Sequence, residues 1–280
     1  MRVIHSDVIT QHIKEMCIEA NLVLSDDVKD RIVRAQTNEK SLIGKQILGQ
    51  LEENMKIAQV DSIPICQDTG MAVVFVEIGQ DVHFEGIFLE DAINEGIRQG
   101  YQEGYLRKSV VKDPLIRENT KDNTPGIIHY SIVAGDSVKL TVAPKGFGSE
   151  NMSKVYMLKP SDGMEGVMKA VLETVELAGP NACPPMVVGV GIGGTFEKCA
   201  LLAKKALTRD LDLASQYPHI AKMEKELLEL INQTGIGPGG LGGKTTALGV
   251  NIETYPTHIA GLPVAINICC HVNRHISRQI

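Results

Sequence analysis

The sequence predicts a mixed α/β fold, with one domain built on a small central sheet surrounded by helices and a helical N-terminal region. Three observations point to this class. Apolar residues recur at helical spacing through residues 40–58. The β-branched runs at 71–79 and 126–144 are typical of strands, and a Gly-Asp turn divides the second run into two strands. Helical and strand patterns then alternate, with no repeat, low-complexity tract or flexible linker between them.

The individual elements follow from the same periodicities. The first 60 residues are predicted to be helical, and another helix is expected to end near Tyr105. In the second half of the chain the patterns predict helices over 164–175, 195–207 and 227–231, and strands over 186–194, 246–254 and 262–269.

The composition excludes several classes of protein. The 280 residues carry 28 Lys and Arg against 34 Asp and Glu, a net charge of −6, with 4% aromatic residues and no Trp. A nucleic-acid binder would need a basic face and stacking rings. No apolar stretch reaches the roughly 18 residues of a membrane span, and the N-terminus lacks a secretory pattern. We therefore expect a cytoplasmic protein whose partner is a small molecule or another protein.

Two glycine-rich segments resemble phosphate loops. Gly189–Gly194 satisfies the GxGxxG pattern between a predicted strand and a predicted helix, and Asp210 and Asp212 follow at about the distance of a ribose contact. This pattern keeps a nicotinamide-dependent dehydrogenase open as an alternative function. The simpler interpretation is that the glycines allow close packing of a strand on a helix, because no complete βαβαβ series follows.

The second glycine-rich segment, 238–245, resembles a Walker A loop but has Pro238 where that motif needs glycine. An amphipathic helical pattern precedes it instead of a buried strand. Nucleotide binding is therefore not expected here. A glycine-rich turn whose backbone amides and Lys244 hold a carboxylate, or shape a pocket, remains open.

The six cysteines divide by their surroundings. Cys17 and Cys199 lie in helical patterns and are expected in the core. Cys66, Cys183 and the pair Cys269/Cys270 are different, because they lie at the edges of elements beside turn formers or polar residues, and no CxxC spacing indicates a zinc ribbon. Three cysteines from distant segments could hold an iron–sulfur cluster with one iron open to substrate. Three unconnected packing thiols are the alternative from spacing alone.

Four polar or glycine positions near these cysteines are candidates for a binding site. Asp68 follows Cys66 and is either a general acid or base or the cap of a turn. Arg107 carries a fork suited to a carboxylate, or is a surface charge. Gly148 would let the backbone approach a ligand closely. His258 is either a pocket residue or a hydrogen-bonded loop residue.

Other polar residues in the same stretches have local interpretations. Asn123 is typical of a turn before the strand that follows Pro125. His271 and His275, near the C-terminus, have no assigned role.

Taken together, six segments in order closely resemble the alpha subunit of class I fumarate hydratase, and the related L-tartrate dehydratase alpha subunit shares the pattern. The segments are PICQDTG, KDNTPGIIHYSIVAGD, PKGFGSENMS, NACPPMVVGVGIGG, GPGGLGGKTTALGV and THIAGLPVAINICCHVNRH. The resemblance runs from about residue 5 to residue 278. It implies that residues 1–280 form an iron–sulfur hydro-lyase domain of the tartrate dehydratase alpha type, equivalent to the N-terminal catalytic domain of single-chain fumarases.

The resemblance also assigns roles to individual residues. It implies that Cys66, Cys183 and Cys270 hold a [4Fe-4S] cluster in which one iron has no cysteine ligand, and that Asp68 and His258 act in catalysis. The positions that match substrate-binding residues of the family are Gln67, Arg107, Lys145, Gly148, Ser149 and Asn151.

The implied reaction is the reversible hydration of fumarate to (S)-malate, a step of the tricarboxylic acid cycle, with L-tartrate dehydration as the alternative in the same family. Single-chain members continue into a second domain that completes the site. We therefore expect a beta subunit as partner, an oxygen-sensitive α2β2 assembly and little activity of this chain alone. A non-catalytic scaffold subunit is a third alternative, in which the cysteines only pack.

Overall fold

The computed structural model describes all residues, 1–280, and the chain folds into two compact units. Unit 1 contains Met1–Ser25, Met55–Phe147 and Arg274–Ile280; unit 2 contains Asp26–Asn54 and Gly148–Asn273. The predicted α/β class is confirmed. The expected single small sheet is wrong, because each unit has its own four-stranded sheet.

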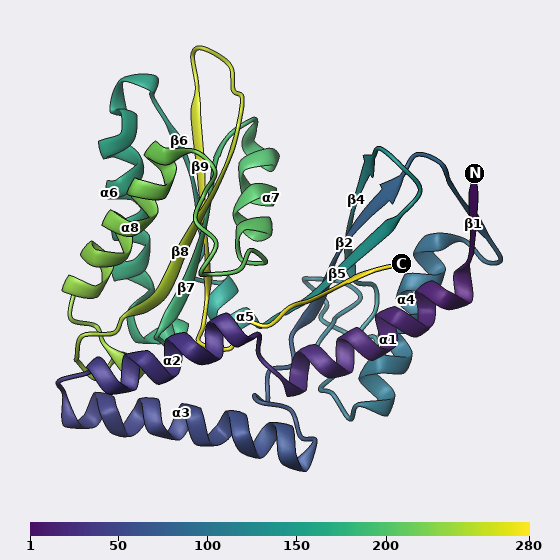
Figure 1. The fold of residues 1–280 in the computed structure, drawn as a ribbon, viewed down its shortest axis with the longest axis horizontal. Helices are drawn as coiled ribbons and strands as arrows, with labels where there is room; N and C mark the ends of the chain where they lie inside the picture. Colours follow the sequence, from purple (N-terminus) through teal and green to yellow (C-terminus); the bar gives the residue numbers. More distant parts are fainter. The chain divides into compact units, whose positions relative to one another are not determined.

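Unit 1 is a sheet covered on one face by two helices (Figure 1). The strand order is β10 (Ile276–Gln279), β5 (Val138–Lys145), β2 (Met71–Gly79) and β4 (Ile127–Val133). The helices are α1 (Ser6–Leu22) and α4 (Leu89–Glu103), and a short parallel pair, β1 (Arg2–His5) with β3 (Val82–Glu85), lies outside the sheet.

The core of unit 1 follows from strand alternation. Val74 and Val76 of β2 point to the helices, where they meet the buried Ile13 of α1 and Ile97 of α4. The two helices approach closely because Gly96 has no side chain, since a Cβ there would lie 2.6 Å from the Thr10 carbonyl oxygen. The apolar residues whose spacing predicted α1, α4 and β2 therefore form the buried face of unit 1.

The two strands predicted within 126–144 exist, but they do not pair with each other. β2 lies between them, parallel to β4 and antiparallel to β5. The Gly135-Asp136 turn instead crosses the end of β2, where the Gly79 N–H donates to the Ser137 carbonyl oxygen at 2.8 Å. A Cβ on Gly79 would lie 2.4 Å from the Gly135 carbonyl oxygen. The expectation of a hairpin is thus corrected by a third strand that the turn has to span.

Unit 2 is a sheet with helices on both faces (Figure 1). The strand order is β6 (Lys154–Leu158), β9 (Leu262–Cys269), β7 (Met186–Gly193) and β8 (Ala247–Tyr255). Helices α6 (Gly163–Ala178) and α8 (Pro218–Gln233) cover one face, and α7 (Phe196–Ala206) covers the other. Val188 and Val190 of β7 point into the larger apolar core with α6 and α8.

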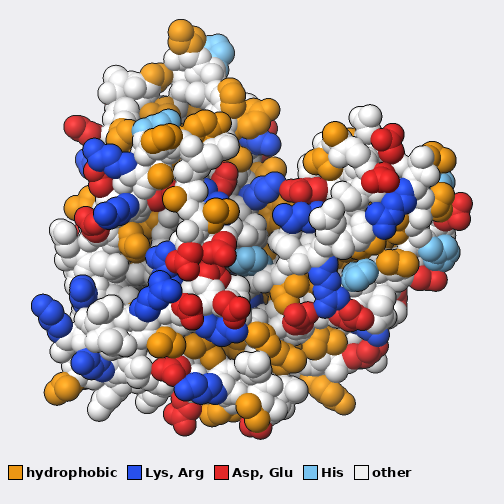
Figure 2. Space-filling view, in the orientation of Figure 1, with side chains coloured by type: hydrophobic (Ala, Val, Ile, Leu, Met, Phe, Trp, Pro, Cys, Tyr) orange, Lys and Arg blue, Asp and Glu red, His pale blue; other side chains and the backbone are white.

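The remaining elements are shorter or lie beside the sheets. They are α2 (Asp26–Asn38), α3 (Leu42–Asp61), α5 (Phe147–Glu150) and the 3-10 turns η1 (Pro160–Asp162), η2 (Gly179–Ala182) and η3 (Pro238–Gly240). The chain passes from one unit to the other four times, once within α3 and once within α5. No helix combines the length and apolar character needed to cross a membrane. On the face that Figure 2 shows, positive and negative side chains are interspersed.

Candidate functional site

The predicted site residues of unit 1 gather around the loop 66–70, which connects α3 to β2. Asp68 is half-buried here. Its Oδ1 accepts the Gly70 N–H at 3.1 Å, which closes a turn, and its Oδ2 accepts the Phe147 N–H at 2.9 Å. The interpretation of Asp68 as a turn cap is therefore confirmed. A second segment also holds the carboxylate in one orientation, and the role as a general acid or base stays a prediction.

Two glycines allow these segments to lie so close together. Gly70 has φ +76°, and a Cβ there would lie 2.7–2.8 Å from backbone atoms of Lys145. A Cβ on Gly146 would lie 3.0 Å from the Asp68 Oδ2. The loop 66–70 and the end of β5 therefore pack backbone against backbone, which fixes the position of the carboxylate.

Arg107 is exposed and lies in the loop that follows α4. Its backbone is bonded to the loop 66–70, since the Thr69 hydroxyl donates to the Arg107 carbonyl oxygen at 3.1 Å. The fully buried Asn123 joins the two loops: its Oδ1 accepts the Ser109 N–H at 2.7 Å and its Nδ2 donates to the Gly70 carbonyl oxygen at 3.2 Å. The predicted Asp68 and Arg107 thus lie on two loops that are bonded together.

Tyr101 of α4 also holds the loop 66–70 in place. It is fully buried, and its hydroxyl donates to the carbonyl oxygens of Thr69 at 2.9 Å and Gly70 at 3.0 Å. Burial raises the pKa of the Tyr101 hydroxyl far above its usual value, so the group remains a donor. Sequence reasoning missed Tyr101 as a site support, because a buried aromatic on a helix has no distinguishing pattern.

Three other predicted residues of unit 1 lie next to Asp68 in the chain or across the sheet. The Cys66 thiol is partly exposed and donates to the exposed Gln67 amide oxygen at 3.4 Å. Lys145, the last residue of β5, pairs with Met71 in the sheet, is buried, and donates from Nζ to the Gly146 carbonyl oxygen at 3.1 Å. Unit 1 therefore brings a thiol, an amide, a carboxylate and two cations to one end of its sheet.

In unit 2, Cys183 and Cys270 come from segments that meet at one end of the sheet. Cys183 ends η2 with φ +51° and is exposed, and Cys270 follows β9 and is partly exposed. His271 joins the two segments, because its Nδ1 lies 3.0 Å from the Cys183 carbonyl oxygen and its N–H donates to the same oxygen at 3.4 Å. The unassigned His271 is thus a structural link between two predicted ligands.

The other cysteines differ from these three, as the sequence predicted for Cys17 and Cys199. Cys17, Cys199 and Cys269 are buried. Burial raises the pKa of the Cys17 thiol to about 12 and also raises that of Cys199, so both are inert thiols at neutral pH. Cys66 belongs to unit 1 and the other two candidates to unit 2, so neither unit alone contains the predicted set of three.

The candidates Gly148, Ser149 and Asn151 lie in and just after the short helix α5. A Cβ built on Gly148 would meet no atom within 4 Å, so the backbone there faces open space, as close approach to a ligand requires. Ser149 is buried and its carbonyl oxygen accepts the Met152 N–H at 3.1 Å, while Asn151 is exposed.

His258 lies at the opposite end of the unit 2 sheet from the two cysteines. It is exposed in the turn between β8 and β9, whereas Cys270 follows the last residue of β9. The eight residues of β9 separate these ends by about 26 Å at the usual rise of a strand. Figure 1 shows this turn as the loop at one end of the β8 and β9 strands. Within unit 2, His258 therefore does not lie beside Cys183 and Cys270, and its catalytic role stays a prediction.

The GxGxxG segment is part of strand β7 and not a phosphate loop. Gly189 and Gly191 lie at paired positions between β8 and β9. A Cβ on Gly191 would lie 2.0 Å from the Cys199 carbonyl oxygen, and one on Gly189 would lie 2.3 Å from that of Ala203. Close packing of β7 on α7 accounts for both glycines. The motif on which the dehydrogenase alternative rested is therefore not a phosphate-binding loop.

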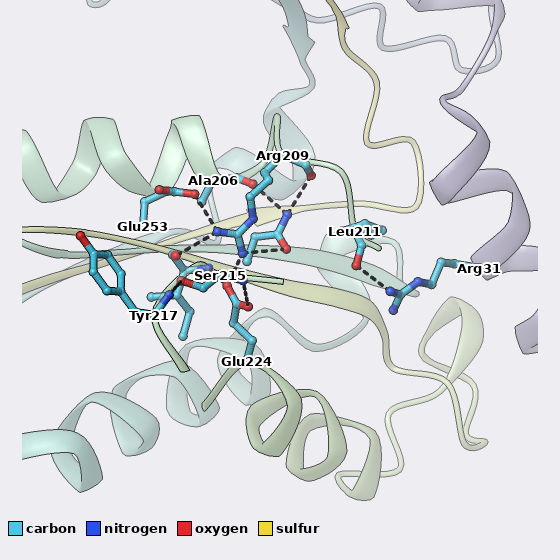
Figure 3. Close-up of polar contacts among 10 residues, drawn as sticks. Arg31, Ala206, Arg209, Leu211, Ser215, Tyr217, Glu224 and Glu253 are labelled. Atoms are coloured by element: carbon cyan, nitrogen blue, oxygen red, sulfur yellow. Dashed lines mark hydrogen bonds and ion pairs between the residues drawn. The ribbon is translucent and has the colours of Figure 1, made fainter. Parts of the chain in front are cut away.

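The acids proposed for ribose binding are likewise used inside unit 2. Asp212 accepts two hydrogen bonds from Arg31 at 3.1 and 2.8 Å, and Asp210 caps a local turn through the Asp212 N–H at 2.8 Å. Figure 3 shows the adjoining network, in which Arg209 binds Glu224 and Glu253. These contacts tie the segment after α7 to β8 and α8, and no acid remains positioned for a ribose.

The second glycine-rich segment holds a carboxylate of the protein itself. Glu39, at the end of α2, is 2% exposed, and its carboxylate accepts N–H groups from Lys244 at 2.9 Å, Thr245 at 3.0 Å, Lys40 at 2.8 Å and Ser41 at 3.1 Å. Burial alone would raise the pKa of this carboxyl, but the four backbone donors outweigh it and hold the pKa below its usual value. Carboxylate binding by these backbone amides is thus confirmed, and Lys244 and Thr245 also line a pocket beside α2.

Comparison with known proteins agrees with this arrangement of motifs. The family model described as fumarate hydratase (Fumerase) matches residues 10–279. A putative L(+)-tartrate dehydratase subunit alpha of Methanocaldococcus jannaschii is 44% identical over 278 residues, covering 97% of each chain. The L(+)-tartrate dehydratase subunit alpha of Escherichia coli is 32% identical over 254 residues, which cover 90% of this chain and 84% of that protein. The chain therefore belongs to the fumarate hydratase family, a family of hydratases and dehydratases within the lyases.

Proposed function

We propose that this chain is the alpha subunit of a two-subunit [4Fe-4S] hydro-lyase that reversibly hydrates fumarate to (S)-malate. The observation that carries the proposal is the junction around Asp68. There a carboxylate fixed by two backbone donors lies on a loop bonded to that of the exposed Arg107. Family membership supplies the class of reaction, and the term subunit alpha in the relatives' names supports a beta partner.

The residues present are chemically suited to a cluster. Cys66, Cys183 and Cys270 are the partly or fully exposed cysteines of the chain, and each lies in a turn or at a strand end. Thiolates of this kind are the usual ligands of iron–sulfur clusters, whereas the buried thiols of Cys17, Cys199 and Cys269 have no access to an added group. When bound, such a cluster would supply an iron that acts as a Lewis acid toward the substrate.

The chain's own residues would carry out the rest of the hydration. Water adds across the double bond, with hydroxyl to one carbon and a proton to its neighbour. Asp68 keeps lone pairs free on both carboxylate oxygens and would exchange that proton at the carbon beside a carboxylate. Arg107 would hold one carboxylate of the substrate, with the open backbone at Gly148 and the amide of Gln67 as further contacts.

L-Tartrate dehydration is a second candidate, and a specific observation favours it: the relatives compared above carry that name. L-Tartrate resembles malate with one more hydroxyl group, so the same carboxylate binding and the same proton transfer would serve both reactions. We keep fumarate as the proposed substrate and treat tartrate as the competing outcome of the test.

The test is anaerobic co-purification of the chain with its beta partner, followed by assay with fumarate, malate and L-tartrate. The proposal expects interconversion of fumarate and malate and about four irons per alpha chain, as in a [4Fe-4S] cluster. Cys66→Ala, Cys183→Ala and Cys270→Ala should each abolish turnover and lower the iron content. The matched controls, Cys17→Ala and Cys269→Ala, should keep both. Turnover of L-tartrate alone would transfer the assignment to the dehydratase, and iron-independent turnover would exclude the cluster.

A further inference from the structure

Arg274, the first unit 1 residue after the cysteine segment, is a buried cation with an unusual set of partners. Its side chain is 4% exposed. Its Nε donates to the Pro144 carbonyl oxygen at 3.2 Å, and its Nη2 donates to the Asp68 carbonyl oxygen. Its Nη1 is buried and has no hydrogen-bond partner. The guanidinium group therefore bonds to two neutral backbone groups and to no carboxylate.

This arrangement is costly for the stability of the fold. A buried arginine normally pairs with an acid, because removing a charge from water is unfavourable unless an opposite charge compensates it. A buried donor without an acceptor adds to that cost. Such local departures from good packing concentrate at functional sites. The cost therefore points to a role for Arg274 other than stabilising the core.

The two bonds of Arg274 close a ring around Asp68. Arg274 holds the Asp68 carbonyl oxygen on one side and the Pro144 carbonyl oxygen on the other. From Pro144 the chain continues to Phe147, whose N–H donates to the Asp68 Oδ2 at 2.9 Å. The ring therefore fixes both the backbone and the carboxylate of Asp68 against the end of β5.

We propose that Arg274 is a positioning residue, which holds the loop 66–70 on β5 so that the Asp68 carboxylate keeps one orientation for proton transfer. The part of this inference that concerns turnover rests on the function proposed above. The part that concerns the position of Asp68 rests only on contacts within unit 1. The two parts can therefore be tested separately on the same protein.

The first arm of the test measures amide hydrogen exchange in the complex with the beta partner. Arg274→Met removes both donors but keeps an apolar stem of similar length. Exchange of the Gly70 and Phe147 amides, which bond the Asp68 carboxylate, should become about tenfold faster, while amides in the centre of β2 keep their rates. Arg278→Met is the matched control, because Arg278 lies on β10 and binds Glu15 and Glu19 of α1. It should leave the Gly70 and Phe147 amides unchanged.

The second arm measures turnover. Misplacement of a catalytic group by about 1 Å costs on the order of 100-fold in rate, so Arg274→Met should lower kcat about 100-fold with KM changed less than about threefold. Arg274→Lys keeps a cation and can bond one of the two carbonyls, so it should recover about a tenth of the kcat. Arg278→Met should retain the wild-type kcat.

Each outcome bears on one of the two statements. Unchanged exchange of Gly70 and Phe147 in Arg274→Met would overturn the positioning role, whatever the turnover. Faster exchange throughout unit 1 would also overturn it, since Arg274 would then be a general stabilising residue. Faster local exchange in Arg274→Met, together with a wild-type complex that turns over neither fumarate nor L-tartrate, would retain the positioning role and reject the proposed function.

Discussion

The loops that hold Asp68 and Glu39 both bind a carboxylate through backbone N–H groups, but the two carboxylates differ in how many of these hydrogen bonds they accept. Both carboxylates accept backbone N–H groups from glycine-containing loops. Glu39 receives donors from four residues and is 2% exposed, so its lone pairs are used and water is excluded. Asp68 receives two donors and is half-buried. A saturated carboxylate stabilises the fold, whereas one that is held but unsaturated remains available to a reactant.

The strongest test of this comparison is Asp68→Asn. The amide keeps the shape of the side chain and one oxygen acceptor but cannot accept a proton at neutral pH. We expect kcat to fall about 10³-fold, equivalent to about 4 kcal/mol of activation free energy, because general acid–base catalysis contributes in this range. The free energy of unfolding should change by less than about 1 kcal/mol. Steady-state assays and urea unfolding of the same sample measure both, and a kcat within a factor of three of wild type would exclude Asp68 as the proton carrier.

Glu39→Gln should show the reverse pattern. The amide group would place its own N–H donors against those of Lys244 and Thr245 and remove the charge that four donors compensate. We expect a loss of about 2–4 kcal/mol in the free energy of unfolding, the usual cost of breaking a buried charged hydrogen-bond set. Specific activity of the folded fraction should be retained. Urea unfolding decides the matter, and full stability of the variant would contradict a structural role for this loop.

A smaller effect is expected when Asp68 is displaced without being replaced. A Cβ on Gly146 would lie 3.0 Å from the Asp68 Oδ2, so Gly146→Ala should push the carboxylate by a few tenths of an ångström. We expect kcat to fall about tenfold with little change in KM or in melting temperature. A kcat within a factor of two of wild type in Gly146→Ala would contradict the inference that a small displacement of the Asp68 carboxylate slows proton transfer.

The smallest expected effect is the pH dependence of stability at Glu39. Its pKa is below the usual value in the folded state, because backbone donors outweigh burial, so ionised Glu39 stabilises the fold. That stability is present above the unfolded pKa of about 4.3 and is lost as the pH falls through the folded pKa. The difference in unfolding free energy between wild type and Glu39→Gln should therefore shrink from pH 7 to pH 3. A constant difference across this range would contradict the lowered pKa.

Local periodicity predicted the elements well, but it could not predict contacts between residues that are far apart in the sequence. The run 71–79 is β2, and the pattern at 262–269 is β9. The partner of a strand is a non-local property, which is why the turn at Gly135 suggested a hairpin that β2 in fact interrupts. In the same way, nothing near residue 244 reveals that Glu39 fills the loop, because 205 residues separate the partners.

The sequence predicted the candidate site residues better than the residues that hold them in place. Neighbouring residues alone predicted that Cys17 is buried and Cys183 accessible, but they did not separate the buried Cys269 from Cys270. The supporting residues Tyr101 and Arg274 were not identified, because each acts through backbone carbonyls that carry no sequence signal. His258 was placed by motif resemblance, and only the strand register shows that it lies at the far end of β9.

The filled loop at Lys244 also explains why a pattern search for nucleotide sites would be misled here. A free phosphate or nucleotide would compete with a carboxylate that is tethered to the same molecule and is already in place. A tethered group acts at a high effective concentration, in the millimolar range or above, so a dissolved anion would need to bind far more tightly to displace it. Glu39 thus occupies the place at this loop that a dissolved anion would need.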